Sequence, residues 1–131
     1  MSGAQQLRYA SLHDVELATL AAAGERGAFG ELVRRHGSAV RGLLRRMGAG
    51  GAEADDTAQD AFLAAFESIT EFRGEGTFAA WVKRIAARQY LKRLQRERRL
   101  ASLAVEAEEG AQSAHHPDAA GRIDLDEAMK C

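Results

Sequence analysis

Apolar residues recur every three or four positions along most of the first hundred residues, which is the spacing of amphipathic helices. The first such segment runs from Ser11 to Gly24. It predicts a helix with Ser11 as its N-cap and Asp14, three residues later, as the capping partner. Gly24 is the predicted stop. The second segment, Gly27 to Gly48, repeats the apolar spacing and places its arginines elsewhere on the cylinder. Each segment therefore predicts one packed helix.

Two further helices are predicted downstream. One spans about residues 54–71, and Asp55 or Asp56 suits its N-terminus because a carboxylate caps free amides and meets the positive end of the helix dipole. The other follows Thr77, a good N-cap, and covers about residues 78–99, a length of roughly 33 Å. The chain is therefore predicted to be all-α, a compact bundle of about four helices.

The two ends of the chain differ in composition from this bundle. Residues 1–10 are expected to be a disordered N-terminus before a helical domain at residues 11–103. Residues 104–122 are acidic, small and polar and contain the single proline, which is typical of a flexible linker. Residues 123–131 begin another amphipathic pattern, which predicts the truncated start of a second domain.

Composition excludes several classes of function. The lone cysteine, Cys131, can form neither an internal disulfide nor a cysteine metal site. No run of about 18 apolar residues suits a membrane span, and Met1 to Leu20 lacks the order of a secretory signal. No nucleophile comes with a base and an orienting group. We therefore expect a cytoplasmic protein that has no enzymatic activity, no cofactor and no membrane partner.

The net charge of −1 hides a strong segregation of charge. Residues 53–75 carry seven acidic side chains against one basic, or −6, whereas residues 83–99 carry eight basic against one acidic, or +7. Such asymmetry predicts two different binding surfaces. A polyanion such as DNA would relieve the repulsion within the basic segment, and a solvated helix end is the alternative.

The helix predicted for the acidic segment has an apolar stripe that faces inward. A strip of polar and aliphatic residues lies on a different face of the same helix. The residues of this strip are Asp56, Gln59, Asp60, Leu63 and Glu67. A charged face for a protein partner is the favoured interpretation. The nearby carboxylates do not predict a metal site, because no histidine or further ligand is placed beside them.

A short glycine-containing segment separates the acidic and basic segments. It reads Arg73, Gly74, Glu75, Gly76 and Thr77. Beside a basic helix, such a loop could hold an unstacked base, because single-strand recognition combines backbone cations with fitted pockets. Trp81, at helical spacing from Phe78, is expected in the core.

Three segments together resemble region 2 of bacterial extracytoplasmic-function (ECF) sigma factors, the initiation subunits that direct RNA polymerase to promoters. They are "GERGAFGELVRRHGSAV" (residues 24–40), "ADDTAQDAFLAAF" (54–66) and "FRGEGTFAAWVKRIA" (72–86), in the family's order and spacing. The resemblance covers about two-thirds of the chain, from about Asp14 to Arg99. It implies a sigma region 2 fold, with residues 123–131 as the truncated start of region 4.

The resemblance also implies site residues and partners. The strip of Asp56, Gln59, Asp60, Leu63 and Glu67 would dock on the β′ clamp helices of core RNA polymerase. The loop of Arg73, Gly74, Glu75, Gly76 and Thr77 would capture flipped bases of the non-template strand as the promoter minus-ten element melts. Phosphates would be held by Lys83, Arg84, Arg88, Lys92 and Arg93. An anti-sigma factor is the implied regulator.

Two alternatives differ in class from a working sigma factor. A sigma-like decoy domain would bind an anti-sigma factor without engaging DNA, and it need not keep a charge of +7 on its last helix. A helical interaction module would have no role in transcription. The family commonly reads "IARN" with an Asp further along, whereas this chain has Arg88 at the Asn position and Lys92 near the Asp position. The promoter sequence is therefore not predicted.

Overall fold

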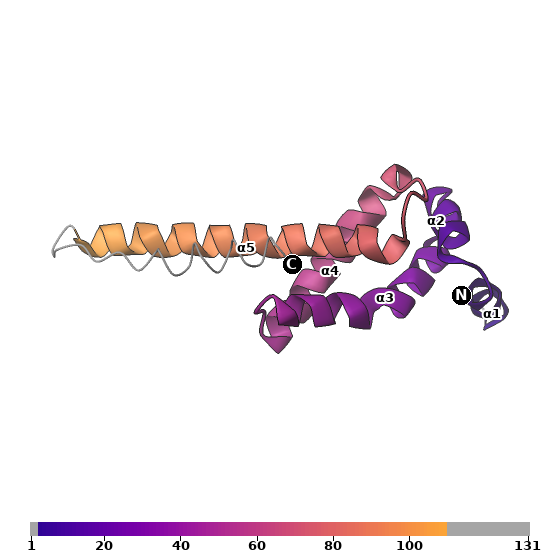
Figure 1. Ribbon diagram of the computed structural model, residues 1–131, viewed down its shortest axis with the longest axis horizontal. Helices are drawn as coiled ribbons and strands as arrows, with labels where there is room; N and C mark the ends of the chain where they lie inside the picture. The colour runs from indigo at the N-terminus through magenta and orange to yellow at the C-terminus, as the bar shows by residue number, and fades with distance from the viewer. Residues whose placement is uncertain (1–2, 110–131) are drawn as a thin grey trace. The chain divides into compact units, whose positions relative to one another are not determined.

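The computed structural model describes residues 3–109, which are helical apart from short connections (Figure 1). The elements in order are α1 (Gly3–Ala10), α2 (Asp14–Ala22), α3 (Arg26–Arg46), α4 (Gly51–Glu67), the 3₁₀ helix η1 (Ile69–Glu71) and α5 (Phe78–Glu109). No strand occurs among the described residues, so the predicted all-α class is confirmed. The described residues divide into two units, residues 3–86 and 87–109, with the boundary inside α5.

The start of the chain corrects the expected disorder of residues 1–10, because residues 3–10 form α1. Tyr9 is buried, and its hydroxyl donates to Glu25 Oε1 at 2.7 Å. Arg35 Nη2 donates to the carbonyl oxygens of Tyr9 and Ala10 at 3.1 Å each. An arginine on the terminal carbonyls stabilises the C-terminus of a helix. These partners lie far along the sequence, so no local pattern predicts α1.

The next helix begins later than predicted. His13, and not Ser11, is the N-cap of α2, and its backbone N–H donates to Glu16 Oε1 at 2.8 Å. The Ser11 hydroxyl instead donates to the carbonyl oxygen of Arg8, at the end of α1. Gly24 follows α2 with φ = 106°, a left-handed conformation that suits the end of a helix. The predicted stop at Gly24 is therefore confirmed.

The start of α4 is also earlier than the sequence indicates. Gly50 is the N-cap, so Asp55 and Asp56 lie inside the helix and the prediction that one of them caps it is wrong. Gly50 adopts the extended conformation of an N-cap and makes no side-chain hydrogen bond, and Glu53 is the acidic residue in the first turn, near the positive end of the helix dipole. The helix ends at Glu67, and η1 covers the last three residues of the predicted range.

The helix α5 starts as predicted but ends later. Thr77 Oγ1 accepts a hydrogen bond from the backbone N–H of Ala80 at 3.1 Å, which confirms Thr77 as a cap. The helix continues to Glu109, so the prediction of a linker is wrong for residues 104–109. These residues are mostly Ala and Glu, which favour helices. The rest of the predicted linker and residues 123–131 lie outside the described residues.

The core of residues 3–86 is formed by α2, α3, α4 and the first turns of α5. Its largest fully buried side chains are Leu17, Leu32, Val40, Leu44, Thr57, Phe78 and Val82. The ring of Phe29 lies 6.4 Å from that of Phe62 and 6.5 Å from that of Phe78, measured between centroids. These contacts join α3 to both α4 and α5. Trp81 was expected in the core, but it is half-buried, and its ring lies 5.7 Å from that of Phe78 at the edge of the core.

A carboxylate within this unit is held by two arginines. Glu31 is buried, and its carboxylate accepts hydrogen bonds from Arg34 Nη2 at 2.7 Å and Arg35 Nε at 2.9 Å. Arg35 Nη1 also donates to Asp14 Oδ1 at 3.0 Å, and Asp14 Oδ2 lies 2.8 Å from His36 Nε2. The network therefore fastens α2 and the end of α1 to α3.

The Glu31 carboxyl gives this network a dependence on pH. Desolvation by burial raises its pKa, but the hydrogen bonds from Arg34 and Arg35 outweigh burial, and the net pKa lies below the usual 4.5. A lowered pKa in the folded state means that the stabilisation is present above the unfolded pKa and is lost as pH falls through the folded pKa.

Replacing Glu31 by Gln should therefore lower the free energy of unfolding by about 1–3 kcal/mol near neutral pH, since charge-assisted hydrogen bonds are lost. The gap between the wild type and this variant should shrink as the pH falls below about 4.5. Urea unfolding followed by circular dichroism at several pH values measures the gap. Glu71→Gln, at an exposed position, is the matched control and should leave stability unchanged at every pH. A gap that stays constant through the acid range would contradict the proposed role of Glu31.

Candidate functional site

The five residues of the predicted docking strip share one helix and are all exposed. Asp56, Gln59, Asp60, Leu63 and Glu67 lie on α4, at spacings of three or four residues that place them on one face. Leu63 is 59% exposed, which is unusual for a leucine in the middle of a helix whose other face is packed. We call these five residues the α4 strip. It combines three acidic side chains with one aliphatic side chain that is exposed for contact.

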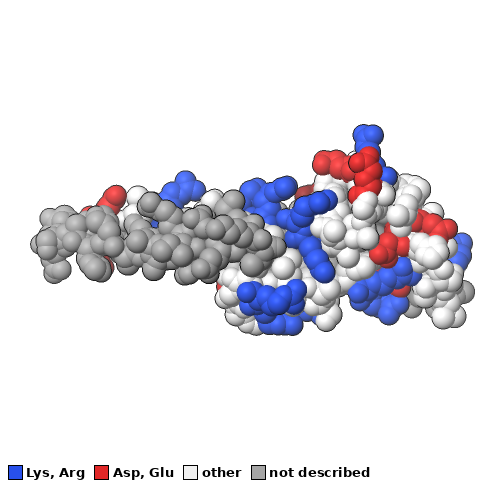
Figure 2. Space-filling view, in the orientation of Figure 1, with Lys and Arg blue, Asp and Glu red and all other residues white. Residues whose placement is uncertain are grey.

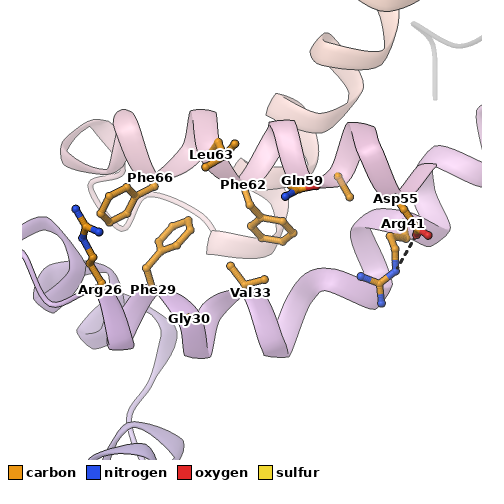
Figure 3. Close-up of a pocket in the computed structure, with 11 residues that line it drawn as sticks. Arg26, Phe29, Gly30, Val33, Arg41, Asp55, Gln59, Phe62, Leu63 and Phe66 are labelled. Atoms are coloured by element: carbon orange, nitrogen blue, oxygen red, sulfur yellow. Dashed lines mark ion pairs between the residues drawn. The ribbon is translucent and has the colours of Figure 1, made fainter. Parts of the chain in front are cut away.

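An apolar groove of about 600 Å³ runs between α3 and α4, beside the α4 strip (Figure 3). Its apolar walls are Phe29, Val33, Phe62 and Phe66. Gln59 and Leu63 line the groove as well as belonging to the α4 strip. A molecule bound in the groove would therefore also touch the strip.

The two ends of the groove are polar. Arg26 lies at one end, close to Phe29 and Phe66 in Figure 3. At the other end Arg41 Nε lies 3.7 Å from Asp55 Oδ1, and both side chains are substantially exposed. Such an exposed pair adds little stability. Sequence reasoning identified the strip but not the groove, because the groove exists only once α3 packs against α4.

The loop of residues 73–77 connects η1 to α5, and all five residues are exposed. Gly74 and Gly76 each have φ = 79°, a conformation that residues with a side chain rarely adopt. The rings of Phe72 and Phe78 meet edge to face at 5.6 Å and close the base of the loop. The loop is therefore shaped by its two glycines and held at both ends by an aromatic pair.

The predicted basic residues fall in both units of the chain. Arg84 is exposed and Lys83 is half-buried in residues 3–86, whereas Arg88 and Lys92 are exposed and Arg93 is half-buried in residues 87–109. The structure brings only Lys83 and Arg84 into the same unit as the loop. Figure 2 shows Lys and Arg side chains along part of α5.

A second group of Lys and Arg side chains is visible at the C-terminal end of α3 (Figure 2). Arg45 and Arg46 are exposed in the last turn of α3. Sequence reasoning assigned them no site. Cations at this end of a helix complement its dipole, which accounts for their position.

Membrane spans and clustered metal ligands are both absent from the described residues. Within residues 3–109 no helix is long and apolar enough to cross a membrane. The same part of the chain holds no group of three or more His, Cys, Asp and Glu side chains suited to a metal ion, and this includes the carboxylates of α4.

The Sigma-70 region 2 family matches residues 32–100. The match contains the α4 strip, the loop of residues 73–77 and all five predicted phosphate contacts, and it covers more than half of the chain. The protein belongs to the Sigma-70 region 2 family.

Individual relatives are ECF and related sigma factors. RNA polymerase sigma factor NccH of Alcaligenes xylosoxydans xylosoxydans is 40% identical over 72 residues, which are 55% of this chain and 39% of that protein. RNA polymerase sigma factor CnrH of Cupriavidus metallidurans is 42% identical over 69 residues, 53% of this chain and 36% of that protein. ECF RNA polymerase sigma factor SigM of Mycobacterium tuberculosis is 37% identical over 83 residues, 63% of this chain and 42% of that protein. The chain thus spans less than half the length of these relatives.

A solved structure of CnrH in complex with the cytosolic domain of CnrY is also similar. It shares 35% sequence identity with this chain at a TM-score of 0.57, and the match covers 77% of this chain and 67% of that one. The sequence-based identification as an ECF-type sigma region 2 domain is confirmed.

Proposed function

We propose that this domain binds core RNA polymerase through the α4 strip and holds melted minus-ten promoter DNA with the loop of residues 73–77 and the basic residues of α5. One observation carries the proposal. An exposed acidic strip and an exposed glycine loop that leads into a basic helix both lie within the range matched by the sigma family. Each surface has the charge that its proposed partner requires.

The α4 strip suits a protein partner. Acidic side chains at its edges give orientation and a favourable encounter rate with a basic surface. Leu63, 59% exposed, supplies an apolar contact that becomes buried on binding. We propose the clamp helices of the β′ subunit as the partner surface.

The loop and α5 suit single-stranded DNA. The backbone of Gly74 and Gly76 lets the loop turn tightly with no side chain in the way of a base. Arg73 begins this loop, and Arg84 is exposed seven residues after its end, so cations are available for the adjoining phosphates. The role proposed for the domain is one of binding and orientation rather than of catalysis.

We also propose an anti-sigma factor as a regulator. The similar structure of CnrH contains the cytosolic domain of CnrY, and the α3/α4 groove offers an apolar surface that shares Gln59 and Leu63 with the α4 strip. A partner seated on this surface would exclude polymerase, because both would need the same two side chains.

The proposal is tested by fluorescence anisotropy of a labelled DNA fork with an exposed non-template minus-ten strand, titrated with core polymerase in the presence and absence of the chain. We expect retention of the fork that depends on the chain and is lost when the strand sequence is scrambled. If the chain binds core polymerase but retains no fork, the decoy interpretation replaces the DNA-binding half of the proposal. If it binds neither, the proposal fails as a whole.

A further inference from the structure

One short motif, two arginines and then two other residues before a serine, occurs twice in the chain. The first copy reads "RRHGS" and covers residues 34–38 on α3, and the second reads "RRLAS" and covers residues 98–102 on α5. Ser38 and Ser102 are both exposed. In sequence the two copies are equivalent, so any difference between them must come from the structure around each serine.

The copy on α3 is locked into the fold. Arg34 donates two hydrogen bonds to the carboxylate of Glu31, at 3.0 and 2.7 Å. Arg35 donates to the same carboxylate, to Asp14 and to carbonyl oxygens at the end of α1. Gly37, immediately before the serine, is buried. A protein that reads this copy would have to break the network that fastens α1 and α2 to α3.

The copy on α5 is open to a partner. Residues 99–104 are all exposed, and they include Leu100 and Leu103 at 59% and 55% exposure. A helical segment with so few buried contacts opens locally for little free energy. It can therefore enter the cleft of an enzyme together with the residues before the serine, whereas a packed helix cannot.

The residues before Ser102 indicate which class of enzyme fits. Arg98 and Arg99 precede the serine by four and three residues, and guanidinium groups pair with carboxylates in a geometry that a partner can recognise. Kinases select their substrates by charge patterns around the accepting hydroxyl. In the helix, the same spacing brings both arginines to the side of α5 that carries Ser102. A phosphate placed on Ser102 would therefore lie beside two cations that can bind it.

We propose that Ser102 is the phosphorylation site for an arginine-directed serine kinase, and that its phosphate weakens the binding of α5 to DNA. The γ-phosphoryl group of ATP is transferred to Ser102 Oγ. A new Oγ–P bond forms, and the bond from the γ-phosphorus to the bridging oxygen breaks, so that ADP leaves with the electron pair. The hydroxyl proton passes to the catalytic base of the kinase. The effect on DNA rests on the proposed function, whereas the modification itself does not.

The effect on DNA follows from charge. A phosphoserine carries about −1.5 to −2 charges at neutral pH, so the net charge of residues 83–102 would fall from +7 to about +5. Its oxygens also attract the guanidinium groups of Arg98 and Arg99, which then attract DNA less. Repulsion between phosphates at a solvent-exposed helix is screened by salt, so the loss of affinity should be largest at low ionic strength.

The modification is tested on the full chain, incubated with ATP and the catalytic subunit of cyclic-AMP-dependent protein kinase as an arginine-directed probe. Peptide mass spectrometry locates the phosphate. We expect phosphate on Ser102 to accumulate at least about tenfold faster than on Ser38, because only the segment on α5 opens readily.

Three variants separate the causes. Ser102→Ala should abolish the main incorporation, and Ser38→Ala should leave it unchanged. Arg99→Ala removes one exposed cation and should slow incorporation at Ser102 roughly tenfold or more, since an acidic group of the kinase loses its partner. Circular dichroism confirms that each variant keeps its helices.

The effect on DNA is then measured by anisotropy of the minus-ten fork with core polymerase and the phosphorylated chain. At about 50 mM salt we expect retention roughly threefold to tenfold weaker than with the unmodified chain, and the difference should shrink as salt is raised. Ser102→Ala treated with the same kinase and ATP is the matched control and should retain the fork as the unmodified wild type does.

Two results would overturn the inference. If the kinase leaves Ser102 unmodified, or modifies Ser38 as fast, Ser102 is not the site that the structure selects. If the phosphorylated and unmodified chains retain the fork equally at low salt, the phosphate does not act on DNA binding. Failure of the unmodified chain to retain any fork is a separate result, because it removes the proposed function while mass spectrometry still decides whether Ser102 is modified.

Discussion

Reversing the charge of both Asp56 and Asp60 to Lys is expected to abolish binding of the domain to core RNA polymerase, with the affinity falling by at least about 100-fold. Both side chains are exposed on α4, four residues apart, so they face the same partner surface. Each reversal removes an attraction and places like charges together, which costs several kcal/mol at an interface. The affinity is measured by titrating labelled chain with core polymerase.

The variant should keep its fold, because neither carboxylate lies in the core or caps the helix. Circular dichroism checks this. Glu106→Lys with Glu108→Lys is the matched control, since it changes the net charge equally at two exposed positions outside α4. Binding that survives in the α4 variant, or is lost equally in the control, would remove the α4 strip from the proposed docking surface.

The α4 strip could be predicted from the sequence because it depends only on local periodicity. The residues of a helix recur on the same face every three or four positions. Residues outside the apolar stripe must therefore lie on another face. The loop of residues 73–77 is equally local, because two glycines and a capping Thr77 mark its limits. Both surfaces are therefore where the sequence places them, although their roles stay proposals.

The features that escaped prediction depend on contacts between distant residues. The helix α1 is held by contacts with distant residues. The Tyr9 hydroxyl donates to Glu25, and the carbonyl oxygens of Tyr9 and Ala10 accept from Arg35. Arg35 was placed on the polar face of its helix, yet it joins Glu31 and Asp14 in one network. Its spacing of four residues from Glu31 was the only sequence signal.

Both cavities were missed for the same physical reason. The α3/α4 groove forms where Phe29 and Val33 of one helix face Phe62 and Phe66 of another. A second cavity, of about 300 Å³, lies between α2 and residues 69–74, which are distant from α2 in the sequence. A cavity is what packing leaves unfilled, so it depends on the relative placement of whole elements and leaves no trace in either segment alone.

The second large effect is expected on DNA binding, from removal of basic residues of α5. Replacing Arg84 and Arg88 together by Ala should weaken retention of the minus-ten fork and flatten its dependence on salt. Each phosphate contact releases counterions, so the slope of log K against log salt concentration falls by about 0.7 per contact for single strands and about 0.9 for duplex. Two lost contacts should therefore lower the slope by roughly 1.4 to 1.8. Anisotropy titrations at several salt concentrations measure it.

A matched control separates contact from net charge. Arg45→Ala with Arg46→Ala removes two exposed arginines from the end of α3 and changes the net charge of the chain by the same amount. If phosphate contact is what matters, this control keeps the wild-type slope while the α5 variant does not. An unchanged slope in the α5 variant would mean that Arg84 and Arg88 do not touch phosphate, and the DNA path would then have to run elsewhere on the domain. Equal flattening in both variants would instead indicate a diffuse attraction of the whole cationic surface for DNA, because only a direct contact depends on which arginines are removed.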